Sequence, residues 1–477
     1  MQVHRTSEIL CVDLDGTLVA TDLLAESLLL LLRSSPWHIF VLPWWLIQGR
    51  ATLKQEIARR VTIDFERLPY RKALVSFLEE ERRRGRRLVL ITAADRRLAQ
   101  GVADHLRLFA EVHGSDGVTN LKGATKASRL VDRYGEGAFT YVGDSSTDLA
   151  VWLAARHAIL AGASESLRRK VARSAKIERT FDDNRVNMRT SALIRVIRPH
   201  QWVKNVLVFV PLITAHRLMD MHAWFNAGKA FAAMCLAAGA IYIANDLLDL
   251  AADRVHPTKR SRPLASGELA IGVGIVCVPI LLIAAALLAL TLPTAFLAWI
   301  GVYGTAAVLY SLWFKQFAIV DVIVLAALYA VRLLAGAAAI AVPMSAWLLA
   351  FSLFFFFSLA LAKRHVELYA TRQANAPPEV RGYLQSDLDT VAMFGIASGY
   401  LSVLVMALYT DGRDTALLYS HPTWLWGFAP LLLFWVSRLW LLAARGHLHE
   451  DPVMFAVRDW ASYAVLLGLG VCMYLAI

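Results

Sequence analysis

The sequence has few cysteines and none at a paired spacing. Its 477 residues contain four, Cys11, Cys235, Cys277 and Cys472. It therefore predicts no disulfide framework, and we expect these thiols to be reduced, structural residues. It also lacks a charged-then-apolar leader, because a short polar stretch runs directly into a candidate strand. We therefore expect the N-terminal part to stay in the cytoplasm.

Charged residues are scarce, at 18% of the chain, while hydrophobic residues make up 57% and the mean hydropathy is +0.49. This composition predicts a membrane part, but the remaining charges require a soluble part as well. Lysine and arginine give a net charge of +11. Much of this excess lies beside apolar stretches, so anionic lipid head groups explain it better than nucleic acid, and we expect no nucleic-acid partner.

The stretch 245–267 carries the most distinctive chemistry. It places Asp246, Asp249 and Asp253 at i, i+3 and i+7, which puts three carboxylates on one face of a helix. Unpaired carboxylates at membrane depth are costly, and hard oxygen ligands favour Mg²⁺ shared with a substrate phosphate. The basic residues that follow suit the rest of a diphosphate: Arg254, Lys259, Arg260 and Arg262. The alternative is a solvated helix end whose acids pair with its own arginines.

Three apolar segments of the N-terminal part each run into a polar cluster. The first, 9–12, precedes Asp13-Leu14-Asp15-Gly16-Thr17; the second, 87–91, precedes Thr92; the third, 139–142, precedes Gly143-Asp144 and Asp148. Helical patterns lie between them. The segments therefore predict a parallel α/β sheet with a ligand at the carboxyl ends of its strands.

These clusters resemble the motifs of the haloacid dehalogenase (HAD) superfamily of phosphotransferases. The resemblance implies that Asp13 is the nucleophile, that Asp15 is the general acid and base, and that Thr92 binds the phosphoryl group. The motif lysine has two candidates: Lys126, which opens the helix before the last strand and is preferred, and Lys122. The implied Mg²⁺ site comprises Asp13, Asp144, Asp148 and the carbonyl group of Asp15. The alternative is the same fold with an inactive site.

This resemblance covers roughly residues 7–165 and implies a Rossmann-like parallel sheet with a small helical cap at about 22–85. The cap is unusually apolar at 23–32 and 37–47, but each run is too short to span a bilayer at ~20 residues. An interfacial hairpin with tryptophans at head-group level fits, and so does an ordinary packed cap. In the first case the phosphatase substrate is a lipid phosphate.

The C-terminal part consists of long apolar stretches. By the ~20-residue criterion they predict about nine spans, at 203–221, 226–245, 271–290, 293–312, 319–339, 344–362, 391–409, 423–443 and 459–476. With the N-terminus inside, the basic residues gather in the inward loops, as the positive-inside rule requires. We expect an all-α polytopic membrane domain at 201–477, joined to the N-terminal domain, 1–165, by a basic linker and interfacial helix at 166–200.

The pattern Asn245-Asp246-x-x-Asp249-x-x-x-Asp253 resembles the first aspartate motif of the UbiA-type membrane prenyltransferases, and the likeness extends over roughly 192–477. The family's second aspartate motif is absent, because its region keeps only Asp321, which argues against prenyl diphosphate as the donor. The branch of decaprenyl-phosphate phosphoribosyltransferases is a closer resemblance. It is carried by Arg198-Pro199-x-Gln201-Trp202-x-Lys204-Asn205, Asp253-Arg254-x-His256-Pro257-x-Lys259, Lys363-Arg364-x-x-Glu367-Leu368, and Glu450-Asp451 with Arg458-Asp459.

This resemblance implies transfer of phosphoribose from 5-phosphoribosyl diphosphate (PRPP) to polyprenyl phosphate. Asp246 and Asp249 would be catalytic and, with Asp253, would hold Mg²⁺ on the departing diphosphate. The expected substrate-binding residues are Lys204, Asn245, Lys259, Arg262, Lys315, Arg332, Lys363 and Arg364. Arg332 lies inside an apolar span, where a charge usually marks function; the alternative is an arginine that snorkels to the interface.

The two resemblances together imply a bifunctional, multi-pass enzyme of the cytoplasmic membrane, with one Mg²⁺ in each domain and both sites facing the cytoplasm. The membrane half would make polyprenyl-phosphoryl 5-phosphoribose, and the N-terminal half would remove the 5-phosphate, giving polyprenyl-phosphoryl ribose for cell-wall arabinan synthesis. The expected partners are PRPP, polyprenyl (decaprenyl) phosphate and membrane lipids, and a homo-oligomer stays open. One alternative is a UbiA prenyltransferase that uses prenyl diphosphate and an aromatic acceptor. Another is a HAD domain that serves as a non-catalytic assembly module.

Overall fold

The computed structural model describes residues 8–181, 190–256, 258–373, 379–448 and 451–477. The chain forms two compact units: unit 1 comprises Met1–Ile197 and Tyr242–Val278, and unit 2 comprises Arg198–Ile241 and Pro279–Ile477. The aspartate-rich stretch therefore belongs to the same compact unit as the N-terminal domain. Pro257, Glu450 and the linker residues 182–189 lie outside the described residues.

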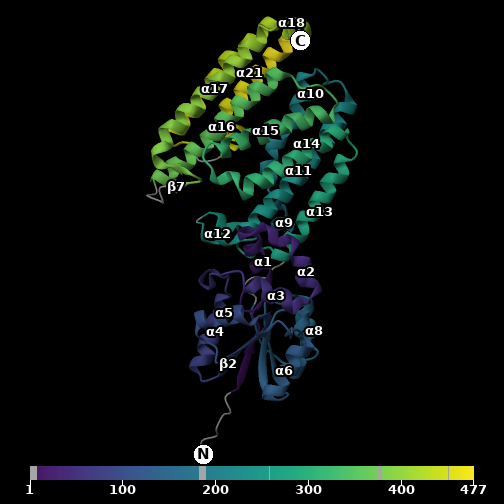
Figure 1. Ribbon diagram of the computed structural model, residues 1–477, viewed down its shortest axis with the longest axis vertical. Helices are drawn as coiled ribbons and strands as arrows, with labels where there is room; N and C mark the ends of the chain where they lie inside the picture. The colour runs from purple at the N-terminus through teal and green to yellow at the C-terminus, as the bar shows by residue number, and fades with distance from the viewer. Residues whose placement is uncertain (1–7, 182–189, 257, 374–378, 449–450) are drawn as a thin grey trace, which may run out of the picture. The chain divides into compact units, whose positions relative to one another are not determined.

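Unit 1 is built on a parallel β-sheet, in which Figure 1 labels β2. The sheet has six strands in the order β3-β2-β1-β4-β5-β6. The strands are β1 (Ile9–Val12), β2 (Arg87–Asp95), β3 (Glu111–Ser115), β4 (Phe139–Gly143), β5 (His157–Ala161) and β6 (Ile177–Phe181). The parallel α/β fold predicted from the sequence is thus confirmed. Strand β6 lies beyond residue 165, in the segment that we expected to be a linker.

Helices cover both faces of this sheet, because successive side chains of a strand point to opposite faces. On β1, Leu10 and Val12 pack against α4 (Lys72–Arg83) and α5 (Arg96–Leu106). Cys11 points the other way, against α6 (Ala124–Tyr134), α7 (Leu149–Ala154) and α8 (Glu165–Ala172). Both faces are therefore dry, as a parallel sheet requires.

A small helical cap lies between β1 and α4. It consists of α1 (Leu23–Ser34), the 3₁₀ turn η1 (Pro36–Phe40), α2 (Leu42–Ile47), α3 (Arg50–Ala58) and the 3₁₀ turn η2 (Phe65–Arg67). Leu31, Trp45 and Ile57 form a separate core that joins α1, α2 and α3. The remainder of unit 1 contains α9 (Thr190–Ile197), the end of α11 (Met221–Leu248), α12 (Leu250–Val255), η5 (Lys259–Ser261) and the start of α13 (Ile271–Ala289).

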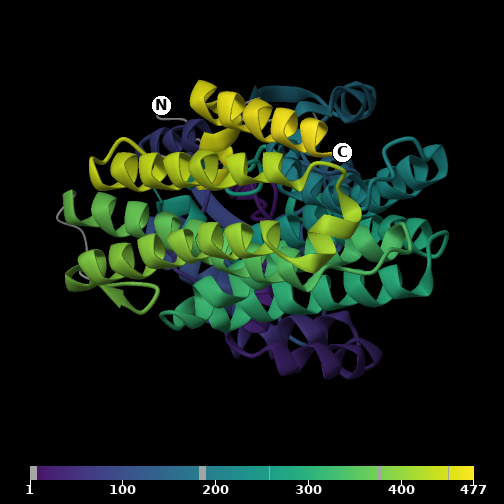
Figure 2. The same cartoon turned by 90° about the horizontal axis from the view of Figure 1, so that it is seen from above.

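Unit 2 is helical. Its further elements are η4 (Pro199–Phe209), α10 (Val210–Thr214), α14 (Thr294–Leu312), η6 (Phe314–Gln316), α15 (Val320–Ala339), α16 (Ala346–Gln373), the short strands β7 (Glu379–Val380) and β8 (Tyr383–Leu384), η7 (Gln385–Asp387), α17 (Leu388–Thr410), α18 (Arg413–Leu418), η8 (Pro422–Gly427), α19 (Phe428–Ala444), α20 (Pro452–Arg458) and α21 (Trp460–Ala476). Helices α16 and α17 lie side by side (Figure 2). At Gly395 of α17 an added Cβ would lie 2.0 Å from the Trp440 ring of α19, so the missing side chain permits their close approach.

In the described part of the chain, seven helices are long and apolar enough to cross a membrane, or eight if α20 and α21, bent by 82°, form one broken span. The chain is therefore a multi-pass membrane protein, with slightly fewer spans than the nine expected. One difference lies at 203–221, where the 3₁₀ segment η4 is followed by the five-residue helix α10. Hydropathy alone reads this segment as a span, because it counts apolar residues and does not detect the tighter winding.

Candidate active sites

The first site lies at the carboxyl ends of β1 and β4. Asp13 follows β1, Asp144 and Asp148 follow β4, and one oxygen of each lies within 4.8 Å of the others. The loop that follows β1 approaches Asp144 closely at Gly16, which has φ +74° and at which an added Cβ would lie 2.3 Å from Asp144 Oδ2. Only glycine has both the backbone freedom and the space for this position.

Lys126 extends from the first turn of α6 into the carboxylate cluster. Its Nζ lies 3.0 Å from Asp13 Oδ1 and 3.4 Å from Asp148 Oδ1, and the side chain is buried. It also donates to the hydroxyl of Tyr141, which donates to Asp148. Lys122 is exposed, although it lines the same cavity. This geometry favours Lys126 as the motif lysine.

Asp15 and Thr92 complete the expected set. Asp15 Oδ1 accepts a hydrogen bond from the backbone of Leu23, at 2.9 Å. Burial, and next the charge of Asp22, raise the pKa of Asp15 to about 8, so this carboxyl group can carry a proton at neutral pH. Thr92 is fully buried within β2, and its hydroxyl accepts from the backbone of Ala94. The sheet thus brings these motif residues together in one cavity.

The carboxylate cluster fits a hard divalent cation. Burial raises the pKa of Asp13 to about 6 and that of Asp144 to about 7, and neighbouring carboxylates add to both shifts. A cation would relieve this desolvation and repulsion, and an all-oxygen donor set suits Mg²⁺. Asp148 has both oxygens engaged, by Tyr141 and by Ser145, so it supports the site.

A cavity of about 690 Å³ opens over this cluster, and several of its polar residues were not predicted. Lys54 of α3 donates to the carbonyl group of Ala93, at 2.5 Å, and to Asn120 Oδ1, at 2.9 Å. Arg50 and Arg71 also line the cavity, and Arg71 holds the carbonyl group of Gly16. These residues belong to no motif, and their only signal is a basic side chain within the cap segment.

The loop after the aspartate motif forms another wall of this cavity. Arg254 lines it, followed by Leu264, Gly267, Leu269, Ala270, Ile271 and Gly272. The guanidinium group of Arg254 pairs with both oxygens of Glu26 on α1, at 2.7 and 3.0 Å, in a buried setting. Asp253, the residue before Arg254, belongs to the aspartate motif, so the two sets of functional residues are adjacent in the chain.

The aspartate motif lies across a helix break. Asp246 lies in the last turn of α11, Asp249 is at the N-cap position of α12, and Asp253 lies within α12. Arg262 Nη1 bridges Asp246, at 3.0 Å, and Asp253, at 2.5 Å, while Arg33 lies 3.3 Å from Asp249. The donor set is all oxygen, as a hard cation requires, and a guanidinium group occupies the space between two of its carboxylates. Asn245 and Lys259 are half-buried beside it.

In unit 2, two expected cations meet at one carboxylate. Lys204 lies 2.8 Å from Asp451, and Lys363 lies 3.5 Å from it. Burial would raise the pKa of Asp451, but the two lysines lower it to about 2. All three line a small cavity of about 30 Å³ together with Tyr329. Asp451 was not among the expected site residues, although it belongs to a motif of the resemblance.

Arg332 is buried within unit 2, so it does not snorkel. It donates to Asn205 Oδ1, at 2.8 Å, and to the Tyr303 hydroxyl, at 3.1 Å. Its guanidinium group also lies over the rings of Tyr303 and Tyr329. Arg332 therefore joins η4, α14 and α15 close to the pair of lysines.

Arg364 does not line the cavity of Lys204 and Lys363. It is fully buried and held by Asp321, at 2.5 Å, by Glu367 and by the Tyr310 hydroxyl. Each nitrogen of its guanidinium group donates to one of these partners, so its position suits a structural role better than phosphate binding. Lys315 lies in η6 and does not line the cavity of Lys204 and Lys363.

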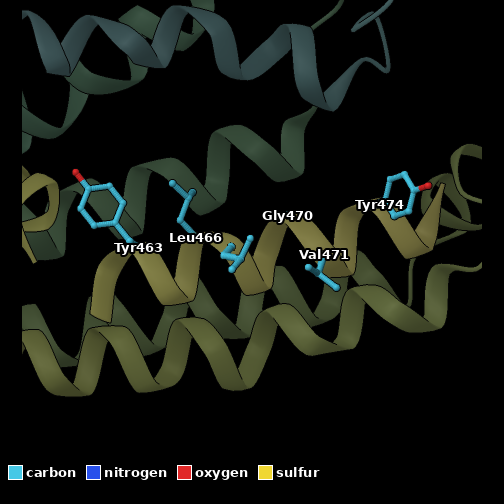
Figure 3. A pocket seen from close by; sticks show the side chains of 6 residues that line it. Tyr463, Leu466, Gly470, Val471 and Tyr474 are labelled. Carbon is cyan, nitrogen blue, oxygen red and sulfur yellow. The ribbon is translucent and has the colours of Figure 1, made fainter. Parts of the chain in front are cut away.

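A further pocket, of about 440 Å³, is unsuited to chemistry. Figure 3 shows its lining residues, which include Tyr463, Leu466, Gly470, Val471 and Tyr474, all on α21. They recur at helical spacing and form an apolar stripe of the kind that lipid chains contact.

The chain matches two protein families. The model of the UbiA prenyltransferase family matches residues 178–467, and that of the haloacid dehalogenase-like hydrolases matches residues 10–152. The uncharacterized protein y4nM of Sinorhizobium fredii is 37% identical over 466 residues, covering 97% of this chain and 89% of that protein. Nodulation protein NoeC of Azorhizobium caulinodans is 35% identical over 279 residues, which cover 57% of this chain and 89% of that protein. A decaprenyl-phosphate phosphoribosyltransferase of Corynebacterium glutamicum is 33% identical over 246 residues, which cover 50% of this chain and 67% of that protein.

Proposed function

The chain belongs to the UbiA prenyltransferase family and carries a haloacid dehalogenase-like domain, and on that basis we propose that it is a bifunctional enzyme of the cytoplasmic membrane. Its membrane half transfers 5-phosphoribose from PRPP to polyprenyl phosphate. Its N-terminal half then removes the 5-phosphate, which gives polyprenyl-phosphoryl ribose, a precursor for arabinan of the cell envelope. Both sites act on the cytoplasmic side.

One observation carries the choice of donor. Asp321, the only aspartate left in the region of the family's second motif, is fully buried. One of its oxygens accepts from Tyr383, at 2.7 Å, and the other from Arg364, at 2.5 Å. It is therefore not available to hold a metal on a prenyl diphosphate, which supports a different donor. The similarity to decaprenyl-phosphate phosphoribosyltransferases supports PRPP.

In the proposed transfer, an oxygen of the acceptor phosphate forms a bond to C1 of the ribose, and the bond from C1 to the diphosphate breaks. The acceptor is already an anion, so no strong base is needed. Mg²⁺, held by Asp246, Asp249 and Asp253, would neutralise the departing diphosphate. Arg262 and Lys259 would exchange their present partners for its outer oxygens.

The substrates carry two further phosphates, which also require cations. Lys204 and Lys363 share the single carboxylate of Asp451, so the trio keeps a net positive charge that can bind an incoming phosphate. Arg332 stabilises the helices around these two lysines through its hydrogen bonds to Asn205 and Tyr303.

In the proposed phosphatase, Asp13 attacks phosphorus and forms an aspartyl phosphate, while the sugar oxygen leaves with the proton of Asp15. The deprotonated Asp15 then takes a proton from water, which attacks the aspartyl phosphate and releases inorganic phosphate. Lys126, 3.0 Å from Asp13, keeps the nucleophile anionic. Mg²⁺ at Asp13, Asp144 and the Asp15 carbonyl group would neutralise the phosphoryl oxygens.

The test is a product analysis. Solubilised protein receives Mg²⁺, PRPP labelled in the ribose and polyprenyl phosphate, and the lipid extract is compared with that of Asp13→Asn. We expect label in the lipid from both proteins, with the 5-phosphate retained only by the variant. Asp132→Asn, which changes an exposed carboxylate of α6, is the matched control and should behave as the native chain does.

Two outcomes would contradict the proposal. If no ribose label enters the lipid while labelled prenyl diphosphate is consumed, the membrane half is a conventional prenyltransferase. If Asp13→Asn still releases the 5-phosphate, the N-terminal domain is not the phosphatase.

A further inference from the structure

The cap of unit 1 exposes a set of large apolar side chains on η1 and α2. Trp37, Phe40, Trp44 and Ile47 are 73, 75, 61 and 79% exposed. We call these four side chains the hairpin face. Soluble surfaces rarely gather large apolar residues in this way, and such a patch marks an interaction site.

The hairpin face is presented by an ordered scaffold. Trp45, the neighbour of Trp44, points inward and packs with Leu31 and Ile57. The guanidinium group of Arg60 lies 4.7 Å from the Trp45 ring. Because one side of α2 is anchored in this way, its other side is directed outward.

The hairpin face is continuous with the phosphatase cavity. Leu46, on α2, lines that cavity. The lining of the same cavity includes Ile271 and Gly272, the first residues of α13, which is long and apolar enough to cross a membrane. A cavity with the first turn of such a helix in its wall lies at the level where that helix would enter the bilayer.

The sequence segment that carries the hairpin face has charges of one sign. The segment 27–55 contains no aspartate or glutamate, but it contains Arg33, Arg50 and Lys54. Tryptophans on a short amphipathic segment, flanked by basic residues, are typical of elements that lie in the head-group region of an anionic bilayer. These charges favour a lipid surface over an apolar groove of another protein.

We propose that the hairpin face docks into the bilayer surface, so that the phosphatase cavity receives its phosphomonoester from lipid and not from water. The apolar wall of Leu46 and Ile271 then accompanies the lipid end of the substrate, while the carboxylate cluster engages the phosphate. The identity of this substrate rests on the proposed function, whereas the docking itself does not.

The first measurement uses fluorescence quenching to test whether the hairpin face lies in the bilayer. Phe40→Cys, in a full-length chain with Cys277 and Cys472 replaced by alanine, carries an environment-sensitive fluorophore in nanodiscs that contain anionic lipid. We expect brominated acyl chains to quench it. Val118→Cys, on an exposed apolar residue of the same unit, is the control and should not be quenched. Equal responses at the two positions would overturn the docking.

The second measurement compares two substrates with the same scissile bond. One is ribose 5-phosphate in solution, and the other is synthetic octadecyl-phosphoryl 5-phosphoribose in nanodiscs. In the triple variant Trp37→Ser, Phe40→Ser, Trp44→Ser, hydrolysis of the lipid substrate should fall by about tenfold or more, while that of ribose 5-phosphate stays within about twofold. The double variant Val118→Ser, Leu153→Ser should change neither rate.

An equal loss on both substrates, or no loss on either, would overturn the inference. If the native chain hydrolyses neither substrate while the fluorophore at position 40 is still quenched, the proposed phosphoribosyl function is wrong but the docking is supported. The two failures are therefore distinguishable.

Discussion

Replacement of Asp15 by asparagine tests the assignment of the general acid most directly. The change is nearly isosteric, and the amide oxygen can still accept from the backbone of Leu23, as Asp15 does at 2.9 Å. What is lost is the proton that the leaving oxygen takes. Loss of a general acid slows catalysis by about 10²–10⁴-fold, which corresponds to roughly 3–5 kcal/mol of barrier.

The loss should depend on the leaving group. A sugar alkoxide is a poor leaving group and needs the proton, whereas p-nitrophenolate leaves without it. In Asp15→Asn we therefore expect rapid formation of aspartyl phosphate from p-nitrophenyl phosphate. The enzyme should then stall, because the same side chain is the base for hydrolysis. A rapid-mixing experiment would show a burst of p-nitrophenolate, about one equivalent per site, followed by little turnover.

The pH dependence provides a second check. The acid form of Asp15 is the competent one, so the phosphorylation rate should fall as the pH rises through its pKa of about 8. Asp22→Asn removes a charge that raises this pKa, so the alkaline limb should move to lower pH. Asparagine is also a good N-cap, which keeps the start of α1 intact. No burst in Asp15→Asn with the good leaving group, or an unmoved limb in Asp22→Asn, would refute the reasoning.

Three further perturbations test the two sites. Gly16→Ala should lower phosphatase activity by about tenfold or more, because the new methyl group would clash with Asp144. The control is Gly85→Ala: Gly85 also has a positive φ but has open space around it, so this variant bears only the backbone strain of about 1–2 kcal/mol. Equal effects of the two variants on activity would refute the steric argument. Arg262→Ala leaves two buried carboxylates unbridged, so thermal stability and ribose transfer should both fall, whereas Arg168→Ala, at an exposed position of α8, should change neither. Chelation with EDTA should abolish phosphate release and lipid labelling, and Mg²⁺ should restore both; activity that survives chelation would contradict a metal in that site.

The parts predicted from sequence share a simple geometric origin. Parallel strands present their carboxyl ends at one edge, so recognition of β1, β2 and β4 suffices to gather Asp13, Thr92 and the motif acids. Strands β3, β5 and β6 were not predicted. In β3 and β6, polar residues interrupt the apolar pattern, and these strands join the sheet through pairing that no local signal reveals.

Long-range partners account for most of the rest. The spacing of the aspartates was visible, but the bridge from Arg262 to Asp246 depends on how the chain turns after α12. Arg364 appeared free in the sequence because Asp321, its partner, lies 43 residues away on another helix. A charged residue within an apolar helix is interpreted as functional by default. Only the packing in the structure distinguishes Arg332, which lies beside the two lysines, from Arg364, whose guanidinium group is bound by Asp321, Glu367 and Tyr310.

Unit 1 is discontinuous in sequence, since it combines Met1–Ile197 with Tyr242–Val278. A gene fragment that ended in the linker would retain every catalytic carboxylate of the phosphatase. It would nevertheless lose Arg254, whose guanidinium group pairs with both oxygens of Glu26, and with it the loop that forms part of the cavity wall. The phosphatase therefore does not behave as a detachable cassette. We expect that a recombination event which exchanges the N-terminal domain between membrane enzymes must also exchange the segment Tyr242–Val278. The phosphatase residues and the aspartate motif would then be inherited together.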